Sequence, residues 1–285
     1  MAEINNQYKI VIIEIVLKNL NYEVSLIDPK NSNLCSLVNF DAAFICLHGK
    51  NGEDGKVQSL LELLKVPFTG SASTASMLAM NKFYSKLIWN DRALKTPQFL
   101  ILNETNLDYK KIITKLGDPF IVKPSSSGSS FGINLVKNKD DLISAFTDAF
   151  KYDSIVIAEE FIVGREFTVS ILGNKSLGVL EISSKNEFYD YNAKYVSNET
   201  VFSKPTDLNP TVLEEMENIA LSAFTSIGCR GWGRVDFMMD KEFNLHLIEV
   251  NTVPGMTDHS LFPLAARHAG LSFEQTVHHI VDLIE

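Results

Sequence analysis

Short apolar segments alternate with helical patterns at the start of the chain. The segments Tyr8–Ile13, Tyr22–Asp28 and Ala42–His48 are rich in Val, Ile, Phe or Tyr, so each is predicted to be a strand. A helical pattern follows over Gly55–Lys65. Strands that alternate with helices predict a mostly parallel sheet in this part of the chain.

The first connection between these strands is unusual. Residues 14–21 are eight residues, whereas a crossover between parallel strands, including its helix, usually takes ~10–12 or more. A dinucleotide-binding Rossmann fold begins with G-x-G-x-x-G after its first strand, but Ile13 is followed directly by Glu14, Ile15, Val16 and Leu17. A nicotinamide-dependent dehydrogenase is therefore disfavoured.

The rest of the chain has mixed patterns, typical of α+β units. A helical pattern covers Gly70–Leu94. Strands are predicted at Phe99–Leu102, Phe120–Lys123, Ile133–Val136, Ile155–Glu159, Phe167–Leu172 and Gly178–Ser183, with helices at Leu107–Lys115, Lys139–Tyr152 and Pro210–Ile227. An irregular loop from Ser184 to about Asn209, a hairpin over Arg234–Asn251 and a final helix from Phe273 complete the prediction.

Composition narrows the class of protein. The 285 residues suggest two domains or one domain with a large insertion, and an apolar content of 45% excludes a disordered or collagen-like chain. A net charge of −9 disfavours a nucleic-acid partner. Cys35, Cys46 and Cys229 are widely separated, which favours buried thiols over a disulfide or zinc site. With no signal peptide and no apolar run of ~20 residues, we expect a cytoplasmic protein without a membrane partner.

The predicted hairpin carries the most informative polar residues. A turn centred on residues 242 and 243 places Asp236 opposite Glu249, and Arg234 opposite Asn251, all on one face. Two opposed carboxylates repel each other and need a cation. With an amide and phosphate oxygens, they form the hard oxygen set that suits Mg²⁺. The alternative is a surface hairpin with incidental charges.

A lysine and a Ser/Gly loop lie between two other predicted strands, in the segment Phe120–Gly132. Lys123 ends the first strand, and the sequence Ser-Ser-Ser-Gly-Ser-Ser follows Pro124. Backbone N–H groups of such a loop, together with a lysine, bind phosphate oxygens. This is not a G-x-x-x-x-G-K-[ST] P-loop. A flexible linker is the alternative, although linkers join domains rather than neighbouring strands.

Three further segments are weaker signals. Segment 158–166 offers backbone groups for a base edge and Glu166 for ribose hydroxyls, but solvated carboxylates explain it equally well. His48 begins a glycine-rich segment after the third predicted strand, where ligands of parallel sheets gather, yet a lone histidine is more often structural. Segment 252–261 contains a Pro-Gly turn, and Asp258 or Ser260 is placed to cap a following helix.

Taken together, these motifs resemble the D-alanine–D-alanine ligases of the ATP-grasp superfamily. The matching segments, in order, are LHGKNGEDG (47–55), MNKFYSK (80–86), VKPSSSGSSFG (122–132), EFYDYNAKY (187–195), GWGRVDFM (231–238) and EVNTVPGMTDHSL (249–261). The resemblance implies an α/β ATP-grasp fold with an N-terminal parallel α/β domain over 1–70. A central domain over 71–160 and a C-terminal domain over 161–285, both α+β, would clamp ATP.

The resemblance also implies roles for individual residues. ATP would be bound by Lys82, Lys123, Ser130, Glu159, Glu160, Ile162, Glu166 and Lys194, and two Mg²⁺ ions, replaceable by Mn²⁺, by Asp236, Glu249 and Asn251. Catalytic residues would be Arg234, Gly255, Tyr195, Ser129 and His48, and the two D-alanines would meet His48, Arg234, Gly255, Ser260 and Leu261. A homodimer is implied as well.

The implied reaction joins two D-alanines through an acyl phosphate, for peptidoglycan precursor synthesis and cell-wall biogenesis. Tyr195 resembles the residue of dipeptide-forming members rather than depsipeptide-forming ones. One departure is the family's loop after the first strand, close to G-G-x-S-x-E-x-x-V-S, which is missing between Ile13 and Tyr22. Glu14 follows the first predicted strand, but nothing in the sequence shows that it substitutes for the missing glutamate. Two alternatives are a non-catalytic or impaired nucleotide-binding homologue and a ligase for another carboxylate–amine pair.

Overall fold

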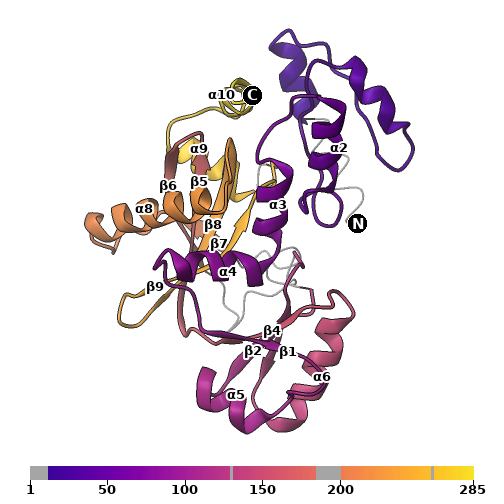
Figure 1. The fold of residues 1–285 in the computed structure, drawn as a ribbon. Coiled ribbons are helices and arrows are strands. Elements are labelled where there is room, and N and C mark those ends of the chain that lie inside the picture. Colours follow the sequence, from indigo (N-terminus) through magenta and orange to yellow (C-terminus); the bar gives the residue numbers. More distant parts are fainter. Residues whose placement is uncertain (1–11, 129–130, 184–199, 258–259) are drawn as a thin grey trace.

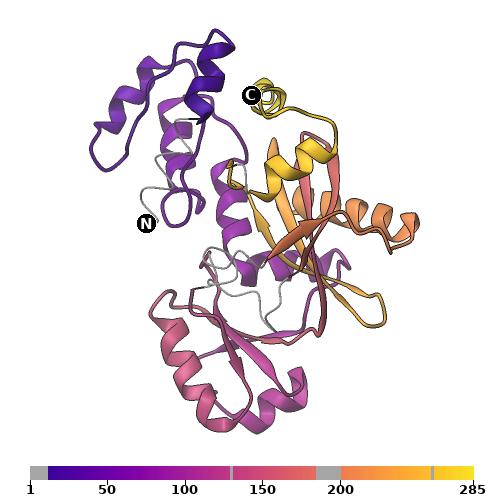
Figure 2. The same ribbon diagram turned by 180° about the vertical axis from the view of Figure 1, so that it is seen from behind.

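The computed structural model describes residues 12–128, 131–183, 200–257 and 260–285, in three regions (Figure 1). An N-terminal region lies at one end and a four-stranded sheet at the other, with a five-stranded sheet between them (Figures 1 and 2). The helices are η1 (Leu34–Asn39, 3-10), α2 (Lys56–Leu64), α3 (Ser73–Met80), α4 (Lys82–Asp91), α5 (Tyr109–Leu116), α6 (Lys139–Phe150), α8 (Pro210–Ser226), α9 (Leu261–His268) and α10 (Phe273–Asp282). The strands are β1 (Phe99–Leu102), β2 (Phe120–Pro124), β3 (Asn134–Val136), β4 (Val156–Glu160), β5 (Gly164–Leu172), β6 (Lys175–Ser183), β7 (Val201–Ser203), β8 (Trp232–Asp240) and β9 (Leu245–Asn251).

The N-terminal region differs most from the sequence prediction. Residues 12–19 are helical, so the strand expected at Tyr8–Ile13 is wrong where it is described; residues 8–11 lie outside the described residues. Ile13 and Leu17, one helical turn apart, are both buried, and this spacing outweighs the strand preference of the local residues. The predicted short crossover is thus itself part of a helix.

The other two N-terminal strand predictions are also wrong. Residues 22–28 are in neither helix nor strand and are largely exposed. Residues 42–48 contain one parallel bridge, between Ala43 and Phe68. Strand-forming residues make a strand only where a neighbour completes the hydrogen-bond ladder. Among the residues that the structure describes here, this bridge is the parallel pairing observed. The predicted helix over Gly55–Lys65 is confirmed as α2.

The four-stranded sheet has the order β1-β4-β2-β3, and its pairs are antiparallel. Helices α5 and α6 supply Ile112, Leu116, Leu142 and Phe146 to one core together with Phe120, Val122, Val156 and Ala158. The alternate residues of β2 and β4 therefore face away from these helices. Lys123 and Glu159 lie on that second face, which β2 and β4 present toward α4.

The five-stranded sheet has the order β7-β6-β5-β8-β9. Helix α8 packs its buried residues Met216, Ala220, Ala223 and Phe224 on one face, against Phe167, Val169, Val235 and Phe237. Helix α9 covers part of the opposite face through Phe262 and its neighbours. Strand β7 falls in the segment expected to be an irregular loop, so three residues of that prediction are corrected.

The predicted hairpin is confirmed, but with a bulge. Arg234 pairs with Asn251 and Asp236 with Glu249, as the sequence predicts. The register shifts next to Asp236, because Phe237 pairs with Leu247 rather than Ile248. Ile248 is therefore the extra residue of β9. The prediction is right at the polar end of the hairpin and one residue out at its turn.

The helical pattern over Gly70–Leu94 forms two helices that meet at Asn81. Asn81 ends α3 and is also the N-cap of α4, where its side chain accepts a hydrogen bond from the backbone N–H of Tyr84. Ala75, Ala79 and Trp89 belong to the apolar core of the five-stranded sheet. The domain boundaries at residues 70 and 160 stay a prediction.

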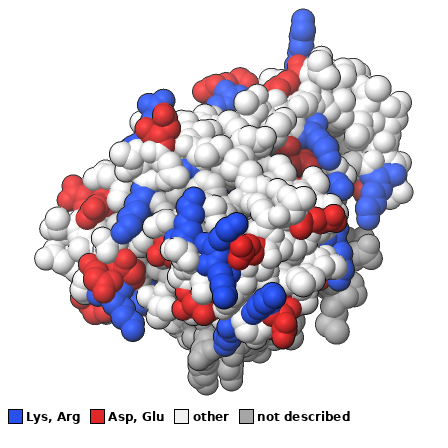
Figure 3. Space-filling view, turned by 60° about the horizontal axis from the view of Figure 1, so that its bottom comes forward, with Lys and Arg blue, Asp and Glu red and all other residues white. Residues whose placement is uncertain are grey.

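Two surface properties bear on the expected partners. On the face shown in Figure 3, the described Lys and Arg side chains lie among Asp and Glu side chains and form no continuous basic stripe. No described helix combines the length and the apolar character that crossing a bilayer requires.

Candidate active site

Four polar side chains gather on one face of the β8–β9 hairpin. The register places Arg234 beside Asn251 and Asp236 beside Glu249. Val235, Phe237 and Val250 point to the opposite face and pack in the α8 core. Asp236 is 4% exposed. The strand alternation thus carries two carboxylates, one amide and one guanidinium to the side of the sheet away from α8.

Each carboxylate has a cationic neighbour. The guanidinium of Arg234 donates to both oxygens of Asp236, at 2.8 and 2.7 Å, and the Thr168 hydroxyl donates to Asp236 Oδ1 at 2.6 Å. Lys82 Nζ lies 2.9 Å from Glu249 Oε2. These contacts offset the repulsion that two opposed carboxylates would otherwise have.

The donor set fits a divalent cation held partly by a ligand. Asp236, Glu249 and Asn251 provide hard oxygen donors on one face. Within the described part of the chain, no three His, Cys, Asp or Glu side chains group closely enough to hold a metal. A cation at the hairpin would therefore need further oxygen atoms, and phosphate supplies them.

Helix α4 brings two lysines to the site from one buried stripe. Its buried residues are Lys82, Ser85, Lys86 and Trp89, which have the spacing of one helix face. Trp89 fixes the helix against α8 by donating from Nε1 to the Ala223 carbonyl at 3.2 Å. Lys82 Nζ also donates to the Ser127 carbonyl at 2.9 Å. The helix thus connects the hairpin with the Ser/Gly loop.

The N-terminus of α4 is docked on the start of the Ser/Gly loop. Asn81 Oδ1 accepts from the Ser125 hydroxyl at 2.6 Å, and Asn81 Nδ2 donates to the Ser126 hydroxyl at 2.9 Å. The backbone N–H groups of Lys82 and Phe83 donate to Ser125. Ser125 is fully buried. These bonds hold the loop against α4, so it is not a free linker along this stretch.

Replacement of Asn81 tests this docking. Asn81→Ala removes the cap and both loop bonds, so we expect the free energy of unfolding to fall by about 1–2 kcal/mol, as for other N-caps. Asn81→Asp keeps an acceptor for Tyr84 and should lose less than half as much. Urea denaturation followed by circular dichroism measures both. Equal losses in the two variants, or none in either, would contradict the capping role.

Lys123 and Glu159 form the core of the second part of the site. Lys123 Nζ donates to Glu159 Oε1 at 2.7 Å, and both residues are buried. Lys86 Nζ lies 2.8 Å from Glu159 Oε2. Burial would raise the pKa of Glu159, but the two lysines together lower it. Glu159 is therefore an ionised carboxylate between two ammonium groups.

The segment between β4 and β5 contains the other candidate nucleotide residues. Glu160 accepts from the Gln98 backbone N–H at 3.2 Å, so its carboxylate is directed to β1. Ile162 is buried. Glu166 lies on β5 in register with Met238 of β8. Gly164 passes so close to Met239 that a side chain would collide with its carbonyl, which explains the glycine here.

His48 lies beside the segment that follows β9. His48 Nδ1 is 3.2 Å from Glu53 Oε1. His48, Ile13, Pro254 and others line a small cavity of about 10 Å³. Glu14 is ion-paired with Lys18 at 2.6 Å. The buried Ile13 therefore stands near His48, and the described contact of Glu14 is with its own helix.

Gly255 and Ser260 are close neighbours. A side chain on Gly255 would meet the Ser260 hydroxyl at 2.7 Å. Ser260 is the N-cap of α9, but its hydroxyl contacts Thr257 instead of capping the helix, and the buried Leu261 follows. The first N–H groups of α9 thus lie next to the Gly255 turn.

Four candidate residues cannot be placed. Ser129, Ser130, Lys194 and Tyr195 lie outside the described residues, and their roles stay predictions. Asp258, one of two residues expected to cap the following helix, also lies outside them. Among the described candidates, the structure joins the hairpin set to Lys82, and Lys123 to Glu159.

Sequence reasoning missed several residues of this network. Thr168, Lys86, Asn81 and Glu53 were given no role, yet each contacts a candidate residue or the loop. Thr168 had a readable signal, because it alternates with Phe167 and Val169 along an apolar strand. Lys86 also had one: it lies four residues after Lys82, on the same helix face.

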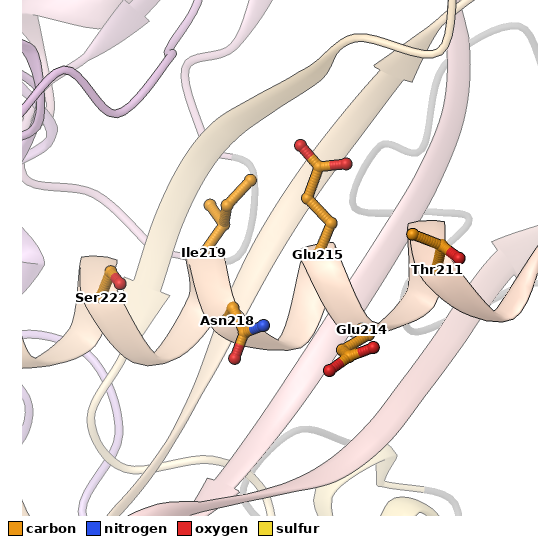
Figure 4. Close-up of a pocket in the computed structure, with 6 residues that line it drawn as sticks. All are labelled: Thr211, Glu214, Glu215, Asn218, Ile219 and Ser222. Atoms are coloured by element: carbon orange, nitrogen blue, oxygen red, sulfur yellow. The ribbon is translucent and has the colours of Figure 1, made fainter.

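A hollow along α8 is unrelated to this site. It is lined by Thr211, Glu214, Glu215, Asn218, Ile219 and Ser222 of that single helix (Figure 4). Helix α8 packs on the face of the sheet opposite Asp236. The hollow shares no residue with the hairpin, α4 or the Ser/Gly loop.

Comparison with known proteins identifies the family to which the sequence is similar. Residues 7–71 match the model of the D-ala D-ala ligase N-terminus, and residues 88–282 match that of the C-terminus. A D-alanine–D-alanine ligase from Saccharophagus degradans is 47% identical over 83% of this chain and 75% of its own length. One from Haemophilus influenzae is 43% identical over 95% of this chain and 93% of its own.

A solved structure gives the same result for the fold. The D-alanine–D-alanine ligase from Bacillus anthracis complexed with ATP superposes with a TM-score of 0.84 at 31% identity, covering 98% of this chain and 91% of that one. The predicted α/β, ATP-grasp fold class is confirmed. The chain belongs to the D-alanine–D-alanine ligase family.

Proposed function

We propose that this protein is an ATP-dependent D-alanine–D-alanine ligase that supplies the dipeptide for peptidoglycan precursors. The carboxylate of one D-alanine takes the γ-phosphoryl group of ATP, which gives an acyl phosphate and ADP. The amine of a second D-alanine attacks the acyl carbon, and phosphate leaves. The observation that carries the proposal is the hairpin set of Arg234, Asp236, Glu249 and Asn251, joined by Lys82 to the Ser/Gly loop.

The nucleotide would lie between the two sheets. Lys82 and Lys123 provide ammonium groups for phosphate oxygens, and the loop that begins at Ser125 provides backbone N–H groups. Glu159 and the Ile162 backbone would meet adenine, with Glu160 beside them, and Glu166 would meet ribose. Lys194 and Ser130 would complete the phosphate contacts.

Asp236, Glu249 and Asn251 would hold Mg²⁺, for which Mn²⁺ would substitute, with two ions as the family resemblance implies. The metal supplies positive charge to the phosphate oxygens. For this, Glu249 would exchange its contact with Lys82 for one with the metal, which releases the Lys82 ammonium group toward the phosphates. Asp236 keeps its orientation through Thr168 and Arg234.

The amino acids would bind beside the metal, at the end of the hairpin where Arg234 pairs with Asn251 and the Gly255 segment follows β9. Arg234 and the Gly255 N–H would stabilise the oxyanion of the tetrahedral intermediate, because preorganised donors lower the energy of developing charge. Ser260 and Leu261, at the first turn of α9, would receive the carboxylate of the second D-alanine. His48, oriented by Glu53, would lie near the first D-alanine. Ser129 and Tyr195 would complete that site.

The missing loop predicts a weaker first-substrate site rather than a different reaction. In the family pattern that loop brings a carboxylate to the first D-alanine, whereas here Ile13 is beside His48 and Glu14 contacts Lys18. We therefore expect a high demand for the first D-alanine. A homodimer, which the family resemblance implies, and the cytoplasmic location expected from the sequence complete the proposal.

Titration with D-alanine tests this function. We expect phosphate release from ATP that requires both Mg²⁺ and D-alanine and yields the dipeptide, identified by mass spectrometry. L-Alanine under the same conditions is the matched control and should give no release. A folded sample that binds ATP by calorimetry but releases no phosphate at saturating D-alanine would be a nucleotide-binding homologue instead. Release that is insensitive to D-alanine would indicate another substrate pair.

A further inference from the structure

Lys86 is a fully buried lysine with no role in the function proposed above. Its side chain has 0% exposure. Its Nζ is 2.8 Å from Glu159 Oε2 and donates to the Thr96 hydroxyl at 2.5 Å, with the Phe99 ring 5.8 Å away. An ammonium group without water is costly unless it is paired and hydrogen-bonded. The surroundings of Lys86 are therefore built to hold its charge.

The ion pair between Lys86 and Glu159 changes the net charge beside Lys123, the lysine proposed to bind phosphate. Glu159 lies between Lys86 and Lys123, at 2.8 and 2.7 Å. The three groups together carry a charge of +1, since one carboxylate is shared by two ammonium groups. Without Lys86, the carboxylate would neutralise Lys123 alone, and the charge of the group would be zero. Lys86 therefore keeps a net positive charge where Lys123 stands.

Lys86 also connects Glu159 and Lys123 to the five-stranded sheet. Thr96, which accepts from Lys86, donates to the Leu247 carbonyl at 2.8 Å, and the Leu247 N–H donates to the Lys95 carbonyl at 2.9 Å. Leu247 lies on β9, two residues before Glu249. A continuous path of hydrogen bonds and ion pairs thus runs from Glu159 in the four-stranded sheet to the β8–β9 hairpin, which is proposed to hold the metal.

We propose that Lys86 is a positioning residue of the nucleotide site, which holds Glu159 by an ion pair so that Lys123 retains its charge for the phosphates of ATP. Lys86 touches neither substrate nor metal in this assignment, and it acts through Glu159. The proposal rests on ATP being the ligand, as in the proposed function. It does not depend on which amino acids are joined.

The acid–base behaviour of Lys86 gives this proposal a distinctive pH dependence. Burial lowers the pKa of Lys86 to about 8, against the favourable charge of Glu159, and the nearby charges of Lys123 and Lys82 lower it further. Lys82 in turn faces Glu249. As the pH rises through about 8, Lys86 loses its proton and Glu159 is left to neutralise Lys123. ATP affinity should therefore fall with rising pH.

Calorimetric titration with ATP and Mg²⁺, without D-alanine, tests the assignment. We expect Lys86→Met to weaken ATP binding about 10-fold at pH 7, which corresponds to 1.4 kcal/mol of binding free energy. In Lys86→Met the decline of affinity between pH 7 and 9 should also disappear. Lys95→Met removes an exposed lysine of the neighbouring segment and should stay within about twofold of wild type. Unchanged affinity in Lys86→Met would overturn the proposal.

A double variant separates positioning from a general structural role. If Lys86 acts through Glu159, Lys86→Met combined with Glu159→Gln should bind ATP no more weakly than the weaker single variant. Additive losses would overturn the assignment. If Lys86→Met does not fold, Lys86→Gln, which can keep a hydrogen bond to Glu159 or Thr96 but not the charge, takes its place, and unchanged ATP affinity in Lys86→Gln would overturn the assignment. Failure of D-alanine turnover would leave these binding results intact, so the two proposals fail separately.

Discussion

Glu249→Gln is expected to lower Mg²⁺-dependent phosphate release by at least about 100-fold while leaving the fold intact. Removal of one preorganised electrostatic group commonly costs ~10²–10³ in turnover. Glu249 is a quarter exposed, so the amide is accommodated at little cost in stability. The variant keeps the shape of the side chain but loses the charge that would hold the metal and that pairs with Lys82.

The measurement is phosphate release as a function of Mg²⁺ concentration. The half-saturating Mg²⁺ concentration should rise in Glu249→Gln together with the loss of maximal rate. Glu242→Gln is the matched control, because Glu242 is an exposed residue in the turn of the same hairpin and should behave as wild type. A Glu249→Gln protein with wild-type rate and wild-type Mg²⁺ dependence would remove Glu249 from the metal site.

Arg234→Met is expected to abolish measurable turnover and to lower the free energy of unfolding by about 3–5 kcal/mol. Asp236 is almost completely buried, and both of its oxygens accept from Arg234. Loss of the guanidinium leaves a buried carboxylate with the Thr168 hydroxyl but without its cation. The same change removes the group proposed to stabilise the oxyanion, so both properties should fall together.

A second substitution separates the two effects. Arg234→Met combined with Asp236→Asn removes the orphaned charge and should recover most of the lost stability in urea denaturation, but no turnover. Addition of Mg²⁺ should stabilise Arg234→Met more than wild type, since a metal replaces the missing cation. If the double variant is as unstable as Arg234→Met, an unpaired Asp236 charge is not the cause.

The four-stranded and five-stranded sheets were predicted well from the sequence, because their helices and strands have strong local signals. The strand at Phe99–Leu102 has the bounds of β1, and the pattern over Pro210–Ile227 differs from α8 by one residue. Turn position and strand alternation were enough to pair Asp236 with Glu249 before any coordinates. The position of the loop after Lys123, between two neighbouring strands, was also predicted correctly, whereas its phosphate-binding role stays a prediction.

The N-terminal region was predicted poorly because its pattern is ambiguous. Ile, Val and Leu in a short run favour a strand by preference, but the spacing of Ile13 and Leu17 also fits one helical face. Packing of Ile13 and Leu17 into the N-terminal core decides between helix and strand, and this packing depends on neighbours that the local pattern does not contain. Lys86 was missed for a related reason: its partners Glu159 and Thr96 become neighbours only when α4 packs between the sheets.

The bulge at Ile248 has a consequence for how this site is encoded. Leu245 and Leu247 face the α8 core, so uninterrupted alternation would send Glu249 and Asn251 into that core as well. The extra residue reverses which side chains of β9 face the core, and it turns Glu249 and Asn251 to the face of Asp236. The inserted residue Ile248 thus decides which half of β9 contributes to the apolar core and which half carries the candidate metal ligands. Deletion of this one residue would displace the carboxylate as surely as its substitution.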